Sequence, residues 1–65
     1  MRITLNGEPR DVTAARLTDL LDELGFGDAR VATAVNEQFV AVADRAGVIV
    51  AEDDRMEIVA PMQGG

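Results

Sequence analysis

The residues best suited to chemistry in this sequence are the last two, Gly64 and Gly65. Glycine makes up about 7% of average sequences, so such a pair is expected by chance in roughly 0.5% of chains. Glycine has no Cβ, so a narrow channel can close around the backbone and the Gly65 carbonyl is unhindered. A free carboxylate there is ionised at neutral pH and can attack the α-phosphorus of ATP. We therefore predict that Gly65 is the reactive residue, carried as an acyl-adenylate during activation.

The preceding residues are expected to present this pair. Pro61 cannot donate a hydrogen bond to a sheet and should end the last strand. The four residues after it reach roughly 13 Å when extended. We expect a domain over residues 1–60 and a flexible tail over residues 61–65, with a frayed tail of no function as the alternative. The residues that partner enzymes would take up are Met62, Gln63, Gly64 and Gly65.

Composition excludes most internal chemistry. The 65 residues include no Cys, no His and no Lys, which removes thiolate nucleophiles, imidazole bases and Schiff-base amines. The densest carboxylate cluster, Glu52-Asp53-Asp54, lacks the spacing of a calcium loop and is predicted to be a solvated turn. We expect no catalytic residue, no metal site and no bound cofactor. The chain is therefore predicted to be a carrier, not an enzyme, and a separate enzyme must supply the ATP site.

The net charge of −6 and the scattered arginines argue against nucleic acid and favour a protein partner with a positive surface. No apolar run approaches the ~20 residues of a membrane span, and no signal peptide is recognisable. We expect a cytoplasmic protein.

The first half of the chain predicts a hairpin and a helix. Residues 2–6 alternate as a strand, Asn6-Gly7 is a strong hairpin signal, and Pro9 suggests that the return strand, residues 8–12, lies at an edge. Thr13 is the expected N-cap of the helix, and Gly25 its left-handed C-cap. The apolar stripe of this helix is Leu17, Leu20, Leu21 and Leu24.

The second half predicts three strands. They cover residues 31–35, a short segment beginning at Phe39, and residues 55–60; a loop or single helical turn lies at 43–47. The order ββαβββ places one helix on a mixed four- to five-stranded sheet, with the first hairpin beside the final strand. This is an α+β fold of the ubiquitin-like β-grasp kind.

Small and apolar side chains on the outer face of the sheet would permit close approach of a partner. The predicted docking residues are Thr4, Ala32, Ala34 and Val59. A solvated sheet face without a partner is the alternative interpretation.

Residues 31–40, VATAVNEQFV, and residues 54–65, DRMEIVAPMQGG, resemble the ThiS family, the sulfur carriers of thiamin biosynthesis. The resemblance covers essentially the whole chain and is most specific over residues 57–65. The family usually has Pro-Arg where this chain has Ala41-Val42, and often a Trp a few residues later, where this chain has residues 43–46, ADRA.

The resemblance implies a cycle centred on Gly65. A ThiF-like adenylyltransferase would adenylate its carboxylate, and sulfur from a donor such as a cysteine desulfurase would convert it to a thiocarboxylate. The ThiG thiazole synthase would then draw this sulfur into the thiazole ring of thiamin. AMP and the thiocarboxylate would be transient covalent groups.

Three other functions remain open from the sequence. One is the small subunit of molybdopterin synthase, which carries the same terminal group, and another is a sulfur carrier of a different pathway, such as methionine or siderophore synthesis. A non-covalent interaction module would make no use of the terminal glycines.

Overall fold

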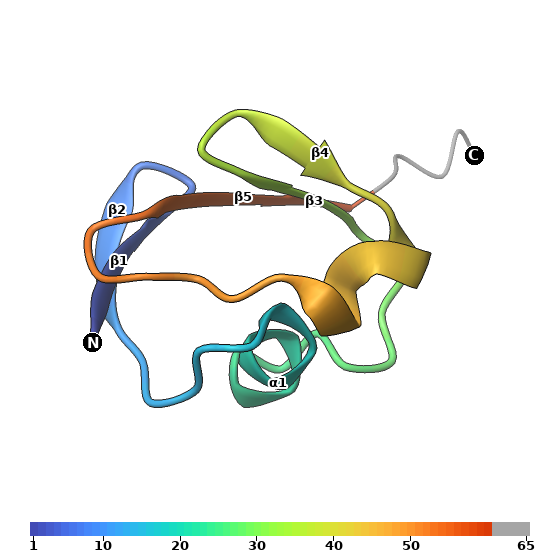
Figure 1. Cartoon of the computed structure of the whole chain (residues 1–65), viewed down its shortest axis with the longest axis horizontal. Coiled ribbons are helices and arrows are strands. Elements are labelled where there is room, and N and C mark those ends of the chain that lie inside the picture. Colours follow the sequence, from blue (N-terminus) through green and yellow to red (C-terminus); the bar gives the residue numbers. More distant parts are fainter. Residues whose placement is uncertain (61–65) are drawn as a thin grey trace.

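The computed structural model describes residues 1–60, and its first element is the predicted hairpin (Figure 1). Strands β1 (Arg2–Leu5) and β2 (Glu8–Asp11) pair antiparallel. Asn6 and Gly7 join them with φ values of 50° and 85°. Because both central residues of the favoured hairpin turn need positive φ, the turn forms where the sequence predicts it.

The sheet has five strands in the order β2-β1-β5-β3-β4. The remaining strands are β3 (Ala32–Val35), β4 (Gln38–Val40) and β5 (Arg55–Val59). β5 runs parallel to β1 and antiparallel to β3, so the last strand lies in the middle of a mixed sheet. The strand that contains Pro9 is at the edge, as predicted, where its missing N–H leaves no gap in the ladder.

Helix α1 (Leu17–Glu23) lies across one face of the sheet (Figure 1). After it, Gly25 has a φ of 90°, and its N–H donates to the Asp22 carbonyl at 3.1 Å. The Phe26 N–H reaches back to the Leu21 carbonyl at 2.7 Å. These two bonds form a Schellman motif, so Gly25 ends the helix as expected.

The prediction that Thr13 caps this helix is wrong. The residue before the helix is Arg16, which makes no side-chain cap. The Leu17 N–H donates to the Val48 carbonyl at 2.9 Å, and the Val50 N–H donates to the Ala15 carbonyl at 2.8 Å. This pairing with a distant segment keeps the chain extended as far as Arg16, so the helix begins only at Leu17.

The core lies between the helix and the sheet. Leu17, Leu20 and Leu21 are buried, and Leu24 packs at its edge, so the predicted stripe is confirmed. The 3-10 helix η1 (Val42–Gly47) occupies the segment predicted as a loop or helical turn. The buried apolar residues are Ile3, Leu5, Val12, Leu17, Leu20, Leu21, Val40, Val50, Met56 and Ile58.

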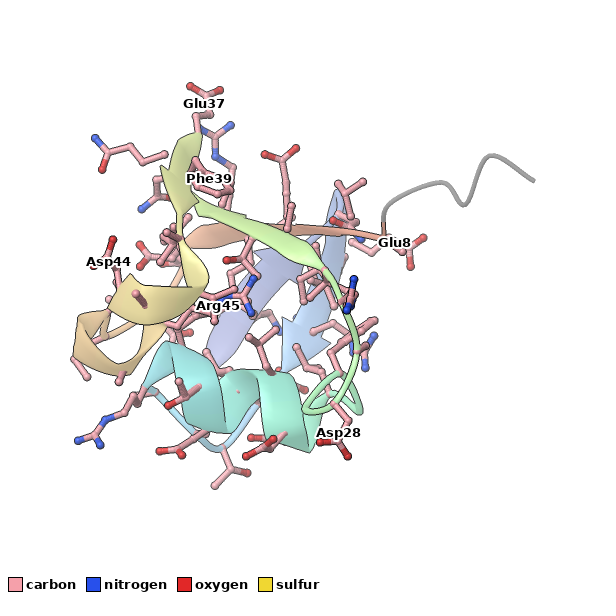
Figure 2. All side chains as sticks on the ribbon, turned by 90° about the vertical axis from the view of Figure 1, so that its right-hand side faces the viewer. Glu8, Asp28, Glu37, Phe39, Asp44 and Arg45 are labelled. Carbon is pink, nitrogen blue, oxygen red and sulfur yellow. The ribbon has the colours of Figure 1, made fainter. Side chains whose placement is uncertain are left out.

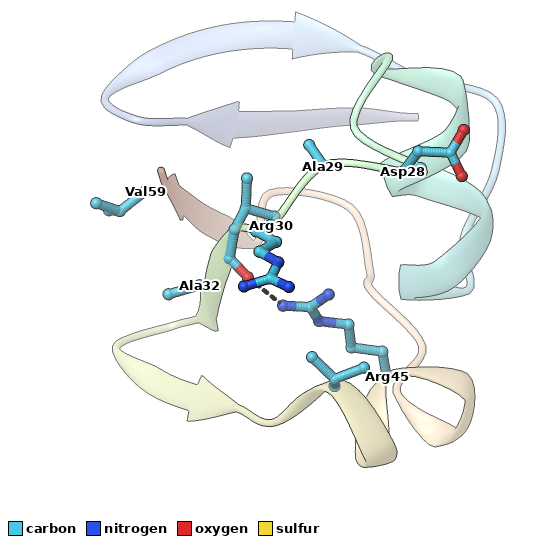
Figure 3. Close-up of a pocket in the computed structure, with 9 residues that line it drawn as sticks. Asp28, Ala29, Arg30, Ala32, Arg45 and Val59 are labelled. Carbon is cyan, nitrogen blue, oxygen red and sulfur yellow. Dashed lines mark hydrogen bonds between the residues drawn. The ribbon is translucent and has the colours of Figure 1, made fainter. Parts of the chain in front are cut away.

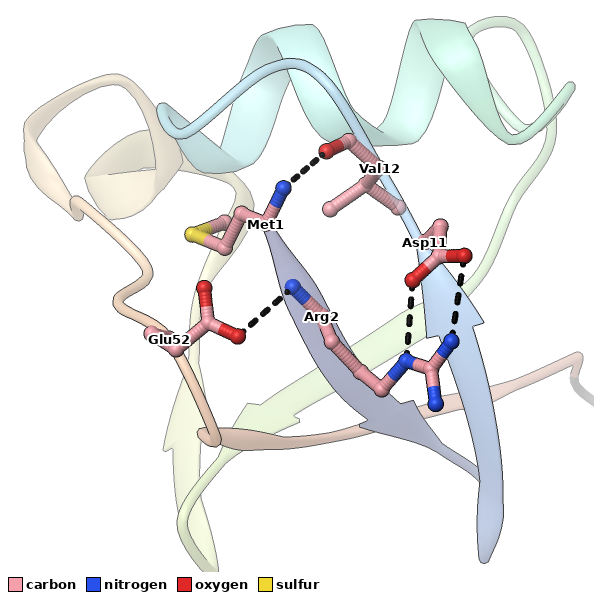
Figure 4. Close-up of polar contacts among 5 residues, drawn as sticks. All are labelled: Met1, Arg2, Asp11, Val12 and Glu52. Atoms are coloured by element: carbon pink, nitrogen blue, oxygen red, sulfur yellow. Dashed lines mark hydrogen bonds and ion pairs between the residues drawn. The ribbon is translucent and has the colours of Figure 1, made fainter.

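Polar contacts connect the beginning of β1 to its surroundings (Figure 4). The Met1 amino group donates to the Val12 carbonyl at 3.0 Å, and the Arg2 N–H donates to Glu52 Oε2 at 3.1 Å. The Arg2 side chain forms an exposed ion pair with Asp11 at 2.9 Å. Exposed ion pairs contribute little to stability, so the Arg2–Asp11 pair adds little to the fold.

Candidate functional site

The reactive residue predicted from the sequence, Gly65, lies outside residues 1–60, as do Met62, Gln63 and Gly64. The proposed boundary between a domain and a tail falls at the limit of the same range. What the structure describes is the point at which the chain leaves the sheet, the end of β5 at Val59.

β5 is held firmly on both sides up to this point. β3 pairs with it from Met56 to Val59, and the Asn6 N–H donates to the Met56 carbonyl at 2.9 Å. The Asn6 side chain then continues the ladder where β1 has ended. Its Oδ1 accepts the Ile58 N–H at 2.9 Å, and its Nδ2 donates to the Ile58 carbonyl at 3.1 Å. The turn residue therefore also fixes the position from which the chain continues.

The predicted docking residues are on the strands facing away from the helix, but they do not form one cluster. Ala32 is directly opposite Val59, whereas Ala34 is opposite Glu57 and Thr4 is opposite Arg55. The structure thus brings Ala32 and Val59 together at the end of β5. Ala34 and Thr4 lie beside charged neighbours, and a docking role for all four stays a prediction.

Two exposed apolar side chains near this face were missed from the sequence. Phe39, which projects from β4, is 72% exposed, and Val42 at the start of η1 is 73% exposed (Figure 2). Val59 itself is 60% exposed. The alternation of Phe39 with the buried Val40 was the available signal, because neighbouring residues of a strand point to opposite faces.

A pocket of about 570 Å³ opens at the end of β5 (Figure 3). Its apolar wall includes Val31, Ala32, Val42 and Val59, which come from β3, η1, β5 and the loop before β3. Arg30 and Arg45 also line it. None of the sequence patterns indicated this pocket, because it is assembled from three segments that are separate in the sequence: residues 27–32, η1 and the end of β5.

Arg45 is the one charged residue among positions 1–60 that is buried, with 8% of its surface exposed. It reaches from η1 toward β3, where its Nε donates to Thr33 Oγ1 at 3.1 Å (Figure 2). Its Nη2 donates to the Val31 carbonyl at 2.6 Å. The Thr33 hydroxyl in turn donates to the Val40 carbonyl at 2.9 Å. This network connects η1 to β3 and to β4.

The carboxyl groups with shifted pKa values serve the fold. Backbone N–H groups of Ala14 and Thr13 donate to Glu23 and lower the pKa of its carboxyl. The Ala51 N–H, with help from the Asn36 amide, lowers the pKa of Asp54. Within residues 1–60, no group of three or more acidic side chains is arranged to hold a metal ion. The predicted solvated turn at residues 52–54 is confirmed, with Asp53 at a φ of 69°.

The described part of the chain therefore offers a rigid sheet, a well-held last strand and an apolar, cationic surface at the end of that strand. A five-stranded mixed sheet with one helix across it and its last strand in the middle defines a ubiquitin-like β-grasp domain. Within residues 1–60, neither α1 nor η1 is long and apolar enough to cross a membrane.

Comparison with known proteins defines the family. The ThiS family profile matches residues 3–65, and the chain belongs to the ThiS family. A sulfur carrier protein ThiS from Thermus thermophilus is 38% identical over 66 residues, covering 97% of this chain and 98% of that protein. A crystal structure of the thiamine biosynthesis protein ThiS from Geobacter metallireducens superimposes with a TM-score of 0.84 at 29% identity, covering 100% of both chains.

Similarity also extends to longer proteins, two thiazole synthases of which this chain spans about a fifth. A thiazole synthase from Magnetococcus marinus is 39% identical over 66 residues, which is 100% of this chain but 20% of that enzyme. This chain therefore spans about a fifth of the length of that relative.

Proposed function

We propose that this protein is a sulfur carrier of thiamin biosynthesis in which Gly65 bears the sulfur as a C-terminal thiocarboxylate. The match of the ThiS family over residues 3–65, which includes the two terminal glycines, is the observation that carries the proposal. The anchoring of β5 by β1, β3 and Asn6 supports it, because a carrier needs a fixed base from which its end is presented.

The chemistry divides between the chain and its enzymes. A ThiF-like adenylyltransferase joins the Gly65 carboxylate to the α-phosphorus of ATP and releases pyrophosphate. A persulfide on a donor such as a cysteine desulfurase then forms the C–S bond as the bond to AMP breaks, and a thiol reductant cleaves the S–S bond of the resulting acyl disulfide to leave the thiocarboxylate. The activating enzyme supplies the electrostatic stabilisation of these steps. The chain itself contributes recognition and position.

A thiazole synthase is the proposed acceptor of the sulfur. The similarity between this whole chain and a fifth of an enzyme named thiazole synthase supports a partnership between the two kinds of domain. The adenylyltransferase and the sulfur donor rest on the chemistry of the carboxylate alone.

The proposal is tested by the intact mass of the chain. Incubation with a ThiF-like adenylyltransferase, Mg-ATP and sulfide should add the difference between one sulfur and one oxygen. Deletion of Gly65 should abolish the change. An unchanged mass, while the same enzyme preparation converts its own ThiS, would contradict the proposal.

A further inference from the structure

Among residues 1–60, Arg45 has hydrogen-bond partners but no counter-ion. Its two partners, Thr33 Oγ1 and the Val31 carbonyl, are neutral. They use two of the five N–H donors of the guanidinium and fix its orientation. A buried charge that is left without an opposite charge is costly, and its field extends into the adjoining space.

A second uncompensated cation lies beside it. The ion pairs within residues 1–60 are Arg2–Asp11 and Arg55–Glu37, and neither involves Arg30 or Arg45. Both of these guanidinium groups point into the pocket at the end of β5 (Figure 3). Asp28 is the carboxylate on the pocket wall, and it points away from them (Figure 3). The protein carries a net charge of −6, so this positive spot opposes the overall charge.

The remaining wall favours an amphipathic occupant. Val42 and Val59 are 73% and 60% exposed, and they border the space that the guanidinium groups enter. An apolar surrounding excludes water and strengthens a charge-assisted hydrogen bond made there. A carboxylate attached to an apolar body satisfies both parts of the pocket, whereas a free small anion would leave the valines uncovered.

We propose that this pocket receives a carboxylate side chain of thiazole synthase, presented beside an apolar side chain that covers Val42 and Val59. This inference rests on the proposed function. Val59 is the last residue of β5, so an enzyme that takes up the following residues must approach the domain at this end. Arg45 and Arg30 would then determine which orientation of the domain the enzyme accepts.

The test is the affinity for thiazole synthase purified from the same organism, measured without ATP by isothermal titration calorimetry. Arg45→Gln should raise the Kd at least about tenfold and Arg30→Gln about threefold. Arg10→Gln is the matched control, because it removes an arginine that makes no ion pair in residues 1–60 and lies on β2, away from the pocket. It should leave the Kd unchanged.

A further readout separates recognition from folding. Added salt should weaken binding of the wild-type chain more than binding of the Arg30→Gln/Arg45→Gln double variant, because the charge pairs are lost in the latter. Arg30 makes no hydrogen bond within the described residues that holds the fold, so Arg30→Gln keeps the test valid even if Arg45→Gln unfolds.

Three results would overturn the inference. The first is a Kd for both pocket variants equal to that of Arg10→Gln, and the second is no binding of the wild-type chain. The third is a shift of the Arg45 guanidinium NMR signals that reaches its limit at millimolar sodium acetate, which would assign the pocket to small anions. Conversion of Gly65 to the thiocarboxylate is measured separately, so a failure of the proposed function is recognised independently of these results.

Discussion

The beginning and the end of β5 are surrounded very differently. At the beginning, the Asn36 side chain accepts the Arg55 N–H at 2.9 Å and donates to Asp54 at 3.0 Å. Asp54 also accepts the Ala51 N–H at 2.8 Å. At the end, beyond the contacts of Asn6, lie an exposed Val59 and two arginines, Arg30 and Arg45, that form no ion pair with any residue the structure describes.

This difference teaches which end of the strand serves the fold. The polar groups at the beginning satisfy one another, so that region needs no partner and gains little from one. The end keeps apolar area and positive charge available. In a domain with so small a core, surface left in this state is best explained by an interaction at that end.

The largest predicted effect is on the core, which supports both ends of β5. Leu20 is fully buried beneath the sheet. Leu20→Ala should lower the free energy of unfolding by about 2–5 kcal/mol, because it removes apolar contacts and leaves a cavity. Urea unfolding followed by circular dichroism measures this. Asp19→Ala, on the exposed side of the same helix, should stay within about 0.5 kcal/mol of the wild type.

A smaller change should loosen only the end of β5. Asn6→Gly keeps the positive φ of the turn but loses both side-chain bonds to Ile58, which should cost about 1–2 kcal/mol. Hydrogen exchange at the Ile58 amide should accelerate, while exchange at the Arg55 amide should change little. Equal protection of the Ile58 amide in both proteins would show that the Asn6 side chain does not hold this end.

The beginning of β5 should respond to pH. The folded-state pKa of Asp54 lies below its usual value of 3.8, chiefly because the Ala51 N–H donates to it. A lowered pKa stabilises the folded state fully above the unfolded value, and this contribution disappears as pH falls through the folded value. Glu23, lowered from 4.5 by the Ala14 and Thr13 N–H groups, acts in the same direction.

Stability should therefore fall as pH drops below about 4.5. Asp54→Asn should be less stable than the wild type at pH 7 and should lose a smaller share of its stability on acidification. Thermal unfolding at pH 7 and pH 3 measures both. The same loss on acidification in the variant and in the wild type would mean that Asp54 is not a source of the pH dependence.

The smallest effect on stability is expected at the exposed valines. Val42→Ser and Val59→Ser should change the free energy of unfolding by less than about 0.5 kcal/mol, because both side chains are mostly in water. If this end serves an interaction, the same variants should weaken binding to thiazole synthase. Destabilisation by more than 1 kcal/mol in thermal unfolding would instead give these valines a structural role.

Local signals in the sequence were sufficient for most of the fold. Positive φ is required at the Asn6-Gly7 turn and at Gly25, and these residue types adopt it readily. The four-leucine stripe indicates which face of the helix is buried. Thr13 failed as a cap because the pairing of residues 15–17 with residues 48–50 is a contact between distant segments. Such pairing cannot be predicted from a few consecutive residues of the sequence.

The site was predictable only in part. The role of the terminal glycines stays a prediction, whereas the placement of Ala32 and Val59 on one face of the sheet follows from strand alternation. The burial of Arg45 could not be inferred, since its acceptors are a hydroxyl and a carbonyl contributed by Thr33 and Val31. An arginine in a short loop normally lies in water, and nothing in its sequence neighbourhood distinguishes this one.

The contrast between the two ends of β5 is tested most directly by NMR of the ¹⁵N-labelled chain during addition of unlabelled thiazole synthase. We expect shift changes and line broadening at Ala32, Val42, Arg45 and Val59. The amides of Asn36, Asp54 and Arg55 should change little. Changes concentrated at those three residues, with the end of β5 unaffected, would contradict the account.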